Sequence, residues 1–162
     1  MSEYHLGINM GHDRSAAVVR DGEIVVAIEQ ERLDRKKHSI GFLYQTSGDP
    51  AFIQVPGECL RYCMDSLDLP LLAMTTITAN MPGEDFAPQI LRSKFSAEIS
   101  HTICEIPSHH LAHAYSAYWP SGFSEALVLV VDATGTTRRA AGLGHQTESY
   151  SLYRASGCEI EP

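Results

Sequence analysis

The stretch that decides the fold reads Ser15-Ala-Ala-Val-Val-Arg-Asp-Gly-Glu-Ile-Val-Val-Ala-Ile-Glu29. Two apolar, β-branched runs flank Asp21-Gly22, and an Asp-Gly pair between such runs is a strong signal for a β-hairpin. A further apolar segment, residues 4–10, comes directly before Gly11. The sequence therefore predicts that the chain opens with three antiparallel strands, at 4–10, 15–20 and 23–29.

The rest of the chain alternates between helical and strand patterns. Residues 57–69 place their apolar side chains on one helical face, and Pro70 stops that helix. The other predicted elements are loops at 46–57 and 80–88, helices at 89–98 and 109–119, and strands at 71–78, 102–106, 126–131, 139–145 and 149–154. Segments 102–132 form one predicted β-α-β unit. We expect an α/β fold, a mixed sheet with helices on its faces, and both faces of the apolar strand 126–131 covered.

Composition excludes several classes of protein. With 162 residues, 44% of them hydrophobic and 20% charged, the chain is not mostly disordered. A formal net charge of −8 argues against binding to nucleic acid or to an anionic membrane. No apolar stretch is long enough to span a bilayer, and no secretory signal is visible. We expect a cytoplasmic protein in which Cys59 and Cys63 are buried, reduced thiols.

The most informative motif is Ser108-His-His-Leu-Ala-His-Ala114. With Ser108 as the N-cap of a helix, His109 and His113 stand at i and i+4 on one helical face. In a β-α-β unit the helix begins where both parallel strands end, and Asp132 follows the second strand, so we expect it beside these histidines. Two imidazoles and one carboxylate leave positions open for substrate, as in mononuclear Fe(II) sites.

Other interpretations of this motif stay open. A His-x-x-x-His pair alone is a weak pattern, and Asp132 could cap the Thr-Gly turn that follows it. The combination favours a metal site. His110 lies off the shared face, and it is either a substrate or catalytic contact or an exposed polar residue.

Two further segments could bind substrate. The loop between the first two strands carries His12 and Asp13, which either form an ordinary turn or contact a substrate that bears hydroxyls or a phosphate. A basic run follows the third strand, with Arg32, Arg35, Lys36 and Lys37 in an otherwise acidic chain. This run either binds phosphate or forms a solvated charged face balanced by neighbouring acids.

The motifs together resemble one known family, the O-carbamoyltransferases of nodulation and antibiotic biosynthesis. The segments that carry the resemblance are 6–9, 11–17, 21–25, 31–38, 109–114, 121–123 and 131–132, in the order of the family. The resemblance implies an actin-like, ribonuclease-H-like fold. It also implies transfer of a carbamoyl group from carbamoyl-adenylate, made from ATP and carbamoyl phosphate, to the hydroxyl of a small acceptor at a metal that is usually iron.

The resemblance also assigns roles to residues. His109, His113 and Asp132 match the metal ligands. Lys37 matches a carbamoyl-adenylate contact, with Arg35 beside it, and His12 and Asp13 lie in the loop that matches the acceptor side. His12 and Asp13 are candidate catalytic residues, and so is His110, which the resemblance does not place on the acceptor side.

Members of this family are several-fold longer than 162 residues. We therefore expect the chain to be the first lobe of the actin-like domain, without the second lobe and the C-terminal YrdC-like domain, inactive alone and with an apolar face for a partner chain or a second copy. The alternatives are a non-catalytic metal- or nucleotide-binding module and an actin-like sugar kinase or ATPase lobe.

Overall fold

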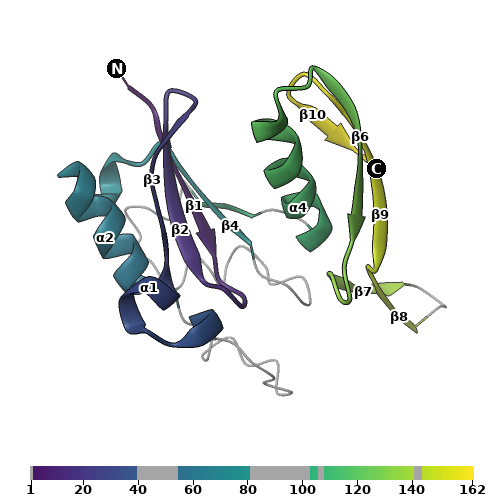
Figure 1. The fold of residues 1–162 in the computed structure, drawn as a ribbon, viewed down its shortest axis with the longest axis horizontal. Helices are drawn as coiled ribbons and strands as arrows, with labels where there is room; N and C mark the ends of the chain where they lie inside the picture. The colour runs from purple at the N-terminus through teal and green to yellow at the C-terminus, as the bar shows by residue number, and fades with distance from the viewer. Residues whose placement is uncertain (1, 40–54, 81–102, 106–107, 141–143) are drawn as a thin grey trace. The chain divides into compact units, whose positions relative to one another are not determined.

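The structure, a computed structural model, describes residues 2–39, 55–80, 103–105, 108–140 and 144–162. The chain divides into two compact units. Unit 1 comprises residues 1–81 and 86–105, and unit 2 comprises residues 82–85 and 106–162. Each unit has its own helices and strands (Figure 1). Each also has its own cluster of buried apolar side chains.

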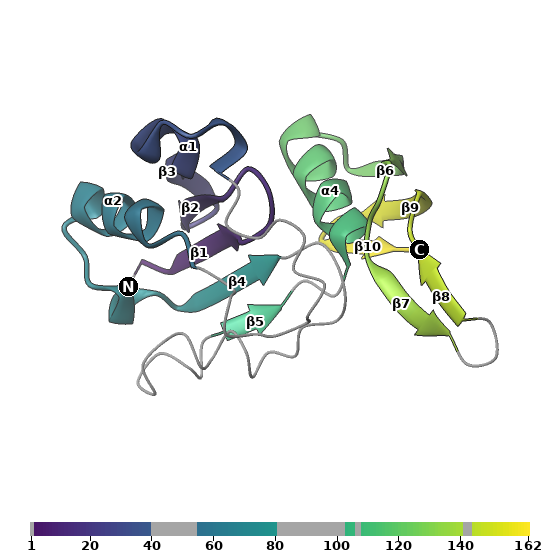
Figure 2. The same cartoon turned by 90° about the horizontal axis from the view of Figure 1, so that it is seen from below.

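Unit 1 is built on a mixed five-stranded sheet in the order β3-β2-β1-β4-β5. Strand β1 is antiparallel to β2 and parallel to β4, and β4 is parallel to β5 (Figure 2). The strands are β1 (Tyr4–Asn9), β2 (Ser15–Arg20), β3 (Glu23–Glu29), β4 (Thr76–Asn80) and β5 (Ile103–Glu105). The three predicted opening strands are confirmed.

The turn between β2 and β3 explains why the opening strands fold as they do. Asp21 and Gly22 have φ angles of 50° and 90°. A two-residue turn with both central φ angles positive matches the right-handed twist of paired strands, and Asp and Gly tolerate that conformation best. The turn therefore fixes the register in which Arg20 faces Glu23.

One helix closes the core of unit 1. Helix α2 (Gly57–Leu67) packs on β2 and β3 and buries Cys59, Leu60 and Cys63, as the predicted helical face requires. Cys59 and Cys63 are free thiols, and burial raises the pKa of Cys59 to about 11. Among the described residues of unit 1, the other helical segments are α1 (Gln30–Asp34) and the 3-10 turns η1 (Lys37–Ser39) and η3 (Leu71–Ala73).

Unit 2 pairs a helix with an antiparallel sheet in the order β10-β9-β6, and β7 and β8 form a separate hairpin. Ala114 and Tyr118 of the helix pack against Val128, Val130 and Tyr153 of the sheet. The elements are α4 (His109–Tyr118), the 3-10 turn η5 (Trp119–Ser121), β6 (Glu125–Val131), β7 (Thr137–Ala140), β8 (Gly144–Thr147), β9 (Tyr150–Ser156) and β10 (Glu159–Glu161).

The outer face of the β6–β9 pair is apolar and exposed. Leu127, Leu129 and Val131 of β6 are 61–73% exposed, and Tyr150 and Leu152 of β9 are 74% and 57% exposed. Leu129 lies opposite Leu152, and Val131 lies opposite Tyr150. Within the described residues nothing covers this face, which is called the outer face of unit 2 below.

Several predictions about the fold need correction or fall outside the described residues. The β-α-β unit over 102–132 is wrong, because β5 joins the sheet of unit 1 while β6 pairs with β9 in unit 2. The strand expected at 71–78 begins only at Thr76, because a 3-10 turn follows Pro70. The predicted helix at 89–98, the loop at 80–88 beyond Asn80, and most of the 46–57 loop lie outside the described residues.

The mixed sheet with helices is confirmed. Of the helices in the described residues, none has the length and apolar character needed to cross a membrane.

Candidate functional site

The start of helix α4 holds the first part of the candidate site. Ser108 is the N-cap, and its Oγ accepts a hydrogen bond of 3.1 Å from the backbone N–H of Leu111. This cap fixes the first turn, so that His109 and His113 lie one above the other. Their rings meet edge to face, with centroids 4.5 Å apart.

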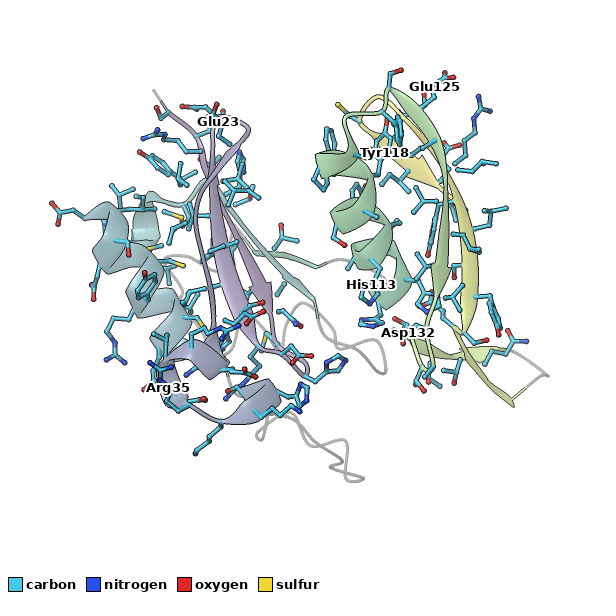
Figure 3. The ribbon with its side chains drawn as sticks, viewed as in Figure 1. Glu23, Arg35, His113, Tyr118, Glu125 and Asp132 are labelled. Carbon is cyan, nitrogen blue, oxygen red and sulfur yellow. The ribbon has the colours of Figure 1, made fainter. Side chains whose placement is uncertain are left out.

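The predicted convergence with Asp132 is present in unit 2. The Nε2 atoms of His109 and His113 are 3.1 Å apart, and Asp132 Oδ2 lies 3.0 Å from the first and 3.6 Å from the second. Figure 3 shows His113 pointing from α4 toward Asp132 at the end of β6. Three potential ligand atoms thus surround one point.

The reason for this convergence differs from the predicted one. Helix α4 and strand β6 run in opposite directions and pack together, so the beginning of the helix lies beside the end of the strand (Figure 1). A helix–strand hairpin brings the start of the helix and the end of the strand together, as a β-α-β unit does. The three residues are therefore neighbours, as predicted, although the predicted topology is wrong.

The spacing of these atoms fits a metal ion. Bonds of about 2.0–2.2 Å to a metal place neighbouring ligand atoms roughly 3 Å apart, which is the size of this triangle. The His109 side chain is 7% exposed, whereas those of Asp132 and His113 are 32% and 51% exposed. A metal held here would therefore be anchored on the protein side and open on the other.

The protonation states of His109 and Asp132 also suit metal binding. Burial, reinforced by the nearby His113, lowers the pKa of His109, so its imidazole is neutral at pH 7. Burial opposes ionisation of Asp132, but hydrogen bonds from the Ala133 N–H and from His109 outweigh it and lower the pKa of the carboxyl. Neutral imidazole and ionised carboxylate are the forms that bind metals.

His110 lies outside this cluster. Its side chain is fully buried, its Nδ1 lies 2.7 Å from Ser151 Oγ, and its Nε2 has no hydrogen-bond partner among the described residues. A Cβ added to Gly135 would come within 2.7 Å of the ring, so only glycine fits there. His110 is thus not the exposed polar residue of one prediction, and its catalytic role stays a prediction.

Sequence reasoning missed Glu148, which ties the start of α4 to the loop after Asp132. Its Oε1 accepts a 2.7 Å hydrogen bond from the Ser108 hydroxyl, and its Oε2 accepts one of 3.0 Å from the Thr136 N–H. No local pattern marks this residue, because its partners lie 40 and 12 positions away.

In unit 1 the two predicted segments meet around Asp13. Its two carboxylate oxygens lie 2.6 Å from Nδ1 of His12 and 2.8 Å from Nδ1 of His38. The hydrogen bond with His12 is the main cause of a lowered Asp13 pKa, and the bond with His38 adds to it. Glu31 Oε2 accepts from the backbone N–H of His38 at 2.7 Å. His12 and Asp13 are predicted site residues, whereas the sequence patterns assign no role to His38.

Backbone contacts hold the loop of Asp13 and the basic run together. The Asp13 N–H donates to the His38 carbonyl at 2.8 Å, and the Arg14 guanidinium donates to the Ser39 carbonyl at 2.7 Å. Asp13, Arg35 and His38 have positive φ angles of 55–61°, a conformation that costs non-glycine residues about 1–3 kcal/mol. Such strain clusters at functional sites, which agrees with a binding role for this region.

The cations predicted to bind an adenylate are exposed. Arg35 and Lys37 form no ion pair with any residue that the structure describes, whereas Arg32 pairs with Glu29 at 3.4 Å. Glu31 and Asp34, which could have neutralised them, accept hydrogen bonds from His38, Lys36 and Ser39 instead. Arg35 and Lys37 are therefore available to an anion.

A groove of about 520 Å³ lies on the sheet of unit 1. Gly7, Ala17 and Ala27 line part of its floor, and Asn9, Glu29 and Arg32 supply polar groups.

Two curated relatives match most of the chain. It is 30% identical to the nodulation protein NolNO of Sinorhizobium fredii over 93% of this chain and 22% of that protein. It is 28% identical to an uncharacterized protein of Synechocystis over 83% of this chain and 26% of that protein. The resemblance drawn from the motifs is thereby confirmed, and the chain spans about a quarter or less of the length of these relatives. No family model matches.

Solved structures give weaker likenesses. YeaZ from Pseudomonas aeruginosa aligns with a TM-score of 0.46 and 12% identity, over 93% of this chain and 66% of that one. A second Pseudomonas aeruginosa protein, described as similar to the peptidase YEAZ, aligns with a TM-score of 0.43 and 11% identity, over 95% and 67%. Scores below 0.5 support no conclusion about the fold.

Proposed function

We propose that this chain, which resembles the O-carbamoyltransferases of nodulation and antibiotic biosynthesis, supplies metal-binding and acceptor-side residues for carbamoyl transfer. The observation that carries the proposal is the convergence of His109, His113 and Asp132. It occurs in a chain of which 93% aligns with a nodulation protein. The mixed sheet of unit 1 supports an actin-like, ribonuclease-H-like architecture as part of the proposal.

The metal ligands come from unit 2. His109, His113 and Asp132 would hold a divalent ion, and Fe(II) is the proposed metal because two imidazoles and a carboxylate are a common ligand set for it. When bound, such an ion would act as a Lewis acid on the carbonyl oxygen of the carbamoyl group. Nε2 of His109 faces the triangle, 3.0 Å from Asp132 Oδ2, and the tautomer that carries its proton on Nδ1 would offer the Nε2 lone pair to the metal.

The resemblance also assigns roles to residues of unit 1, which are proposed separately from the metal site. Arg35 and Lys37 bind the phosphate of carbamoyl-adenylate, because they are exposed cations without acidic partners among the described residues. His12, held by Asp13 at 2.6 Å, takes the proton of the acceptor hydroxyl. The acceptor oxygen then bonds to the carbamoyl carbon, the bond from that carbon to the adenylate oxygen breaks, and AMP leaves.

A titration of the metal-free chain with Co(II), followed by absorption spectroscopy, tests the metal site. We expect one ion per chain and a loss of affinity of at least about tenfold in His113→Ala, because one of three ligands is removed. His5→Ala is the matched control, since His5 is a half-exposed histidine of unit 1 outside the cluster. Equal binding by wild type and His113→Ala would remove the basis of the proposal.

A second measurement separates a transferase from a non-catalytic metal-binding module. We expect a non-hydrolysable carbamoyl-adenylate analogue to bind the chain, and Lys37→Gln to weaken that binding in calorimetry. Arg20→Gln is the control, because it removes a cation elsewhere on unit 1. Metal binding without any binding of the analogue would favour the module.

A further inference from the structure

Glu148 lies where the two elements that carry the candidate ligands approach each other. It stands between β8 and β9, and its carboxylate is half-buried among groups from the start of α4 and from the loop after β6. Besides Ser108 and Thr136, it faces the backbone N–H of His110 at 3.5 Å. One side chain thus contacts both the N-cap of the helix and the turn that follows Asp132.

Backbone hydrogen bonds around Glu148 extend the same connection to the ligands themselves. The Glu148 N–H donates to the Thr136 carbonyl at 3.0 Å, and the Asp132 N–H donates to the carbonyl of the adjacent Ser149 at 3.0 Å. Thr136 in turn uses its Oγ1 to accept a 2.8 Å hydrogen bond from the backbone N–H of His109. The segment 148–149 therefore fixes the backbone of Asp132 directly and that of His109 through Thr136.

The charge of Glu148 is suited to this place. Burial opposes its ionisation, but the hydrogen bonds from Ser108, Thr136 and His110 outweigh burial and lower the pKa of the carboxyl. An ionised carboxylate at the start of a helix is favourable, because the unpaired N–H groups there carry partial positive charge. Tight packing adds to the constraint, since a Cβ on Gly135 would come within 2.8 Å of the Cβ of Glu148.

We propose that Glu148 is a positioning residue, which holds the start of α4 against the loop after β6 so that His109 and His113 stay in register with Asp132. This inference rests on the proposed function, because it concerns the same metal ligands. Glu148 contributes no ligand atom to the triangle. It acts through Ser108 and Thr136, and residues that orient metal ligands commonly change affinity by about 10–100-fold when they are removed.

Three variants of the full chain test the role, with Co(II) affinity and the visible absorption spectrum as readouts. We expect Glu148→Ala to weaken Co(II) binding by about tenfold or more and to shift the absorption bands, because the ligands lose their register. Glu148→Gln should stay within about threefold of wild type. Its amide oxygen can accept from Thr136, and its amide NH2 can donate to Ser108. Glu161→Ala is the control, since Glu161 is an exposed carboxylate of the same unit.

Circular dichroism must show that each variant is folded at the temperature of the titration. If Glu148→Ala does not fold, Thr136→Val decides instead, because it removes only the Oγ1 that accepts from the His109 N–H and should still weaken binding several-fold. A folded Glu148→Ala with wild-type affinity and spectrum overturns the positioning role, as does an unchanged Thr136→Val. Failure of the wild type to take up Co(II) would instead overturn the proposed function.

Discussion

The two units use the same strand pattern and treat its outward positions in opposite ways. In unit 1, β1 alternates between buried Leu6 and Ile8 and the small, exposed Gly7 between them. In unit 2, β6 alternates just as regularly, yet its exposed positions are Leu127, Leu129 and Val131. The alternation follows from the pleated backbone, which points successive side chains to opposite faces of the sheet. The type of residue at the outward positions depends on whether that face is in contact with solvent. An exposed strand position can therefore hold either a small residue or a large apolar one in the described residues. In unit 2 the exposed positions are apolar, and the helix of that unit does not cover them.

The largest expected effect is on the free energy of unfolding, and it compares a substitution in the buried core of unit 1 with one on the outer face of unit 2. Ile77→Ala should lower the free energy of unfolding by about 2–5 kcal/mol, because Ile77 is fully buried and the substitution leaves a cavity. Leu129→Ala, at a residue that is 65% exposed, should change it by less than about 0.5 kcal/mol. Urea denaturation measures both, and a large cost at Leu129 would mean that the outer face is covered in the isolated chain.

The second prediction contrasts two glycines. Gly135→Ala should destabilise the chain by about 1–3 kcal/mol and weaken Co(II) binding, because the new Cβ would lie 2.6–2.8 Å from atoms of His110 and Glu148. Gly57→Ala, at the start of α2 with nothing within 4 Å, should be neutral or slightly stabilising. Thermal unfolding and metal titration measure the two effects, and equal melting temperatures for both variants would argue against the tight packing.

The third prediction concerns the outer face of unit 2. The double variant Leu129→Ser/Leu152→Ser should bind a hydrophobic dye several-fold less than wild type and associate less in size-exclusion chromatography with light scattering. Contiguous exposed apolar patches promote such interactions, and single exposed residues do not. Ile24→Ser is the control, because Ile24 of unit 1 is 72% exposed but stands outside the patch. Similar dye binding by all three proteins would show that the patch is closed in solution.

The smallest effect is a pH dependence in unit 1. The hydrogen bonds with His12 and His38 lower the pKa of Asp13 below its ordinary value of 3.8. The pairing therefore contributes stability above that ordinary value, and the contribution is lost as the pH falls through the lower, folded-state pKa. Because the side chain is 47% exposed, the amount is below about 1 kcal/mol. Asp13→Asn should flatten the acid limb of a stability–pH curve slightly, and an unchanged slope below pH 4 would contradict the pairing.

Helices, strands and turns that depend on neighbouring residues were predictable from the sequence. The distribution of the strands among separate sheets was not. The Asp21-Gly22 turn, the apolar face of α2 and the cap at Ser108 each depend on neighbouring residues, and each is present as expected. The pairing of β6 with β9 depends on a match between strands far apart in sequence, for which one chain offers no signal. For that reason the predicted β-α-β unit failed although its strands exist.

The same division applies to the candidate site. His109 and His113 share a helix and Asp132 follows the next strand, so short-range reasoning selected them. Glu148 and His38 act through contacts with distant residues, and neither stands out by type or spacing. Residues that orient others are missed more readily, because their role exists only after the chain has folded.

The helix–strand hairpin of unit 2 has a consequence for the order of folding events. His109 and Asp132 are separated by 23 positions, and α4, η5 and β6 account for most of the chain between them. The entropy lost on closing a loop grows with its length, so contacts between nearby segments can form before distant ones. The three candidate ligands thus belong to an element of low contact order. The contacts of Glu148 with this element can form only after the chain has passed through the β7–β8 hairpin. If the proposed metal site and the proposed role of Glu148 are both correct, a metal ion present during refolding would bind first to a loosely ordered triangle and more tightly once the contacts of Glu148 have formed.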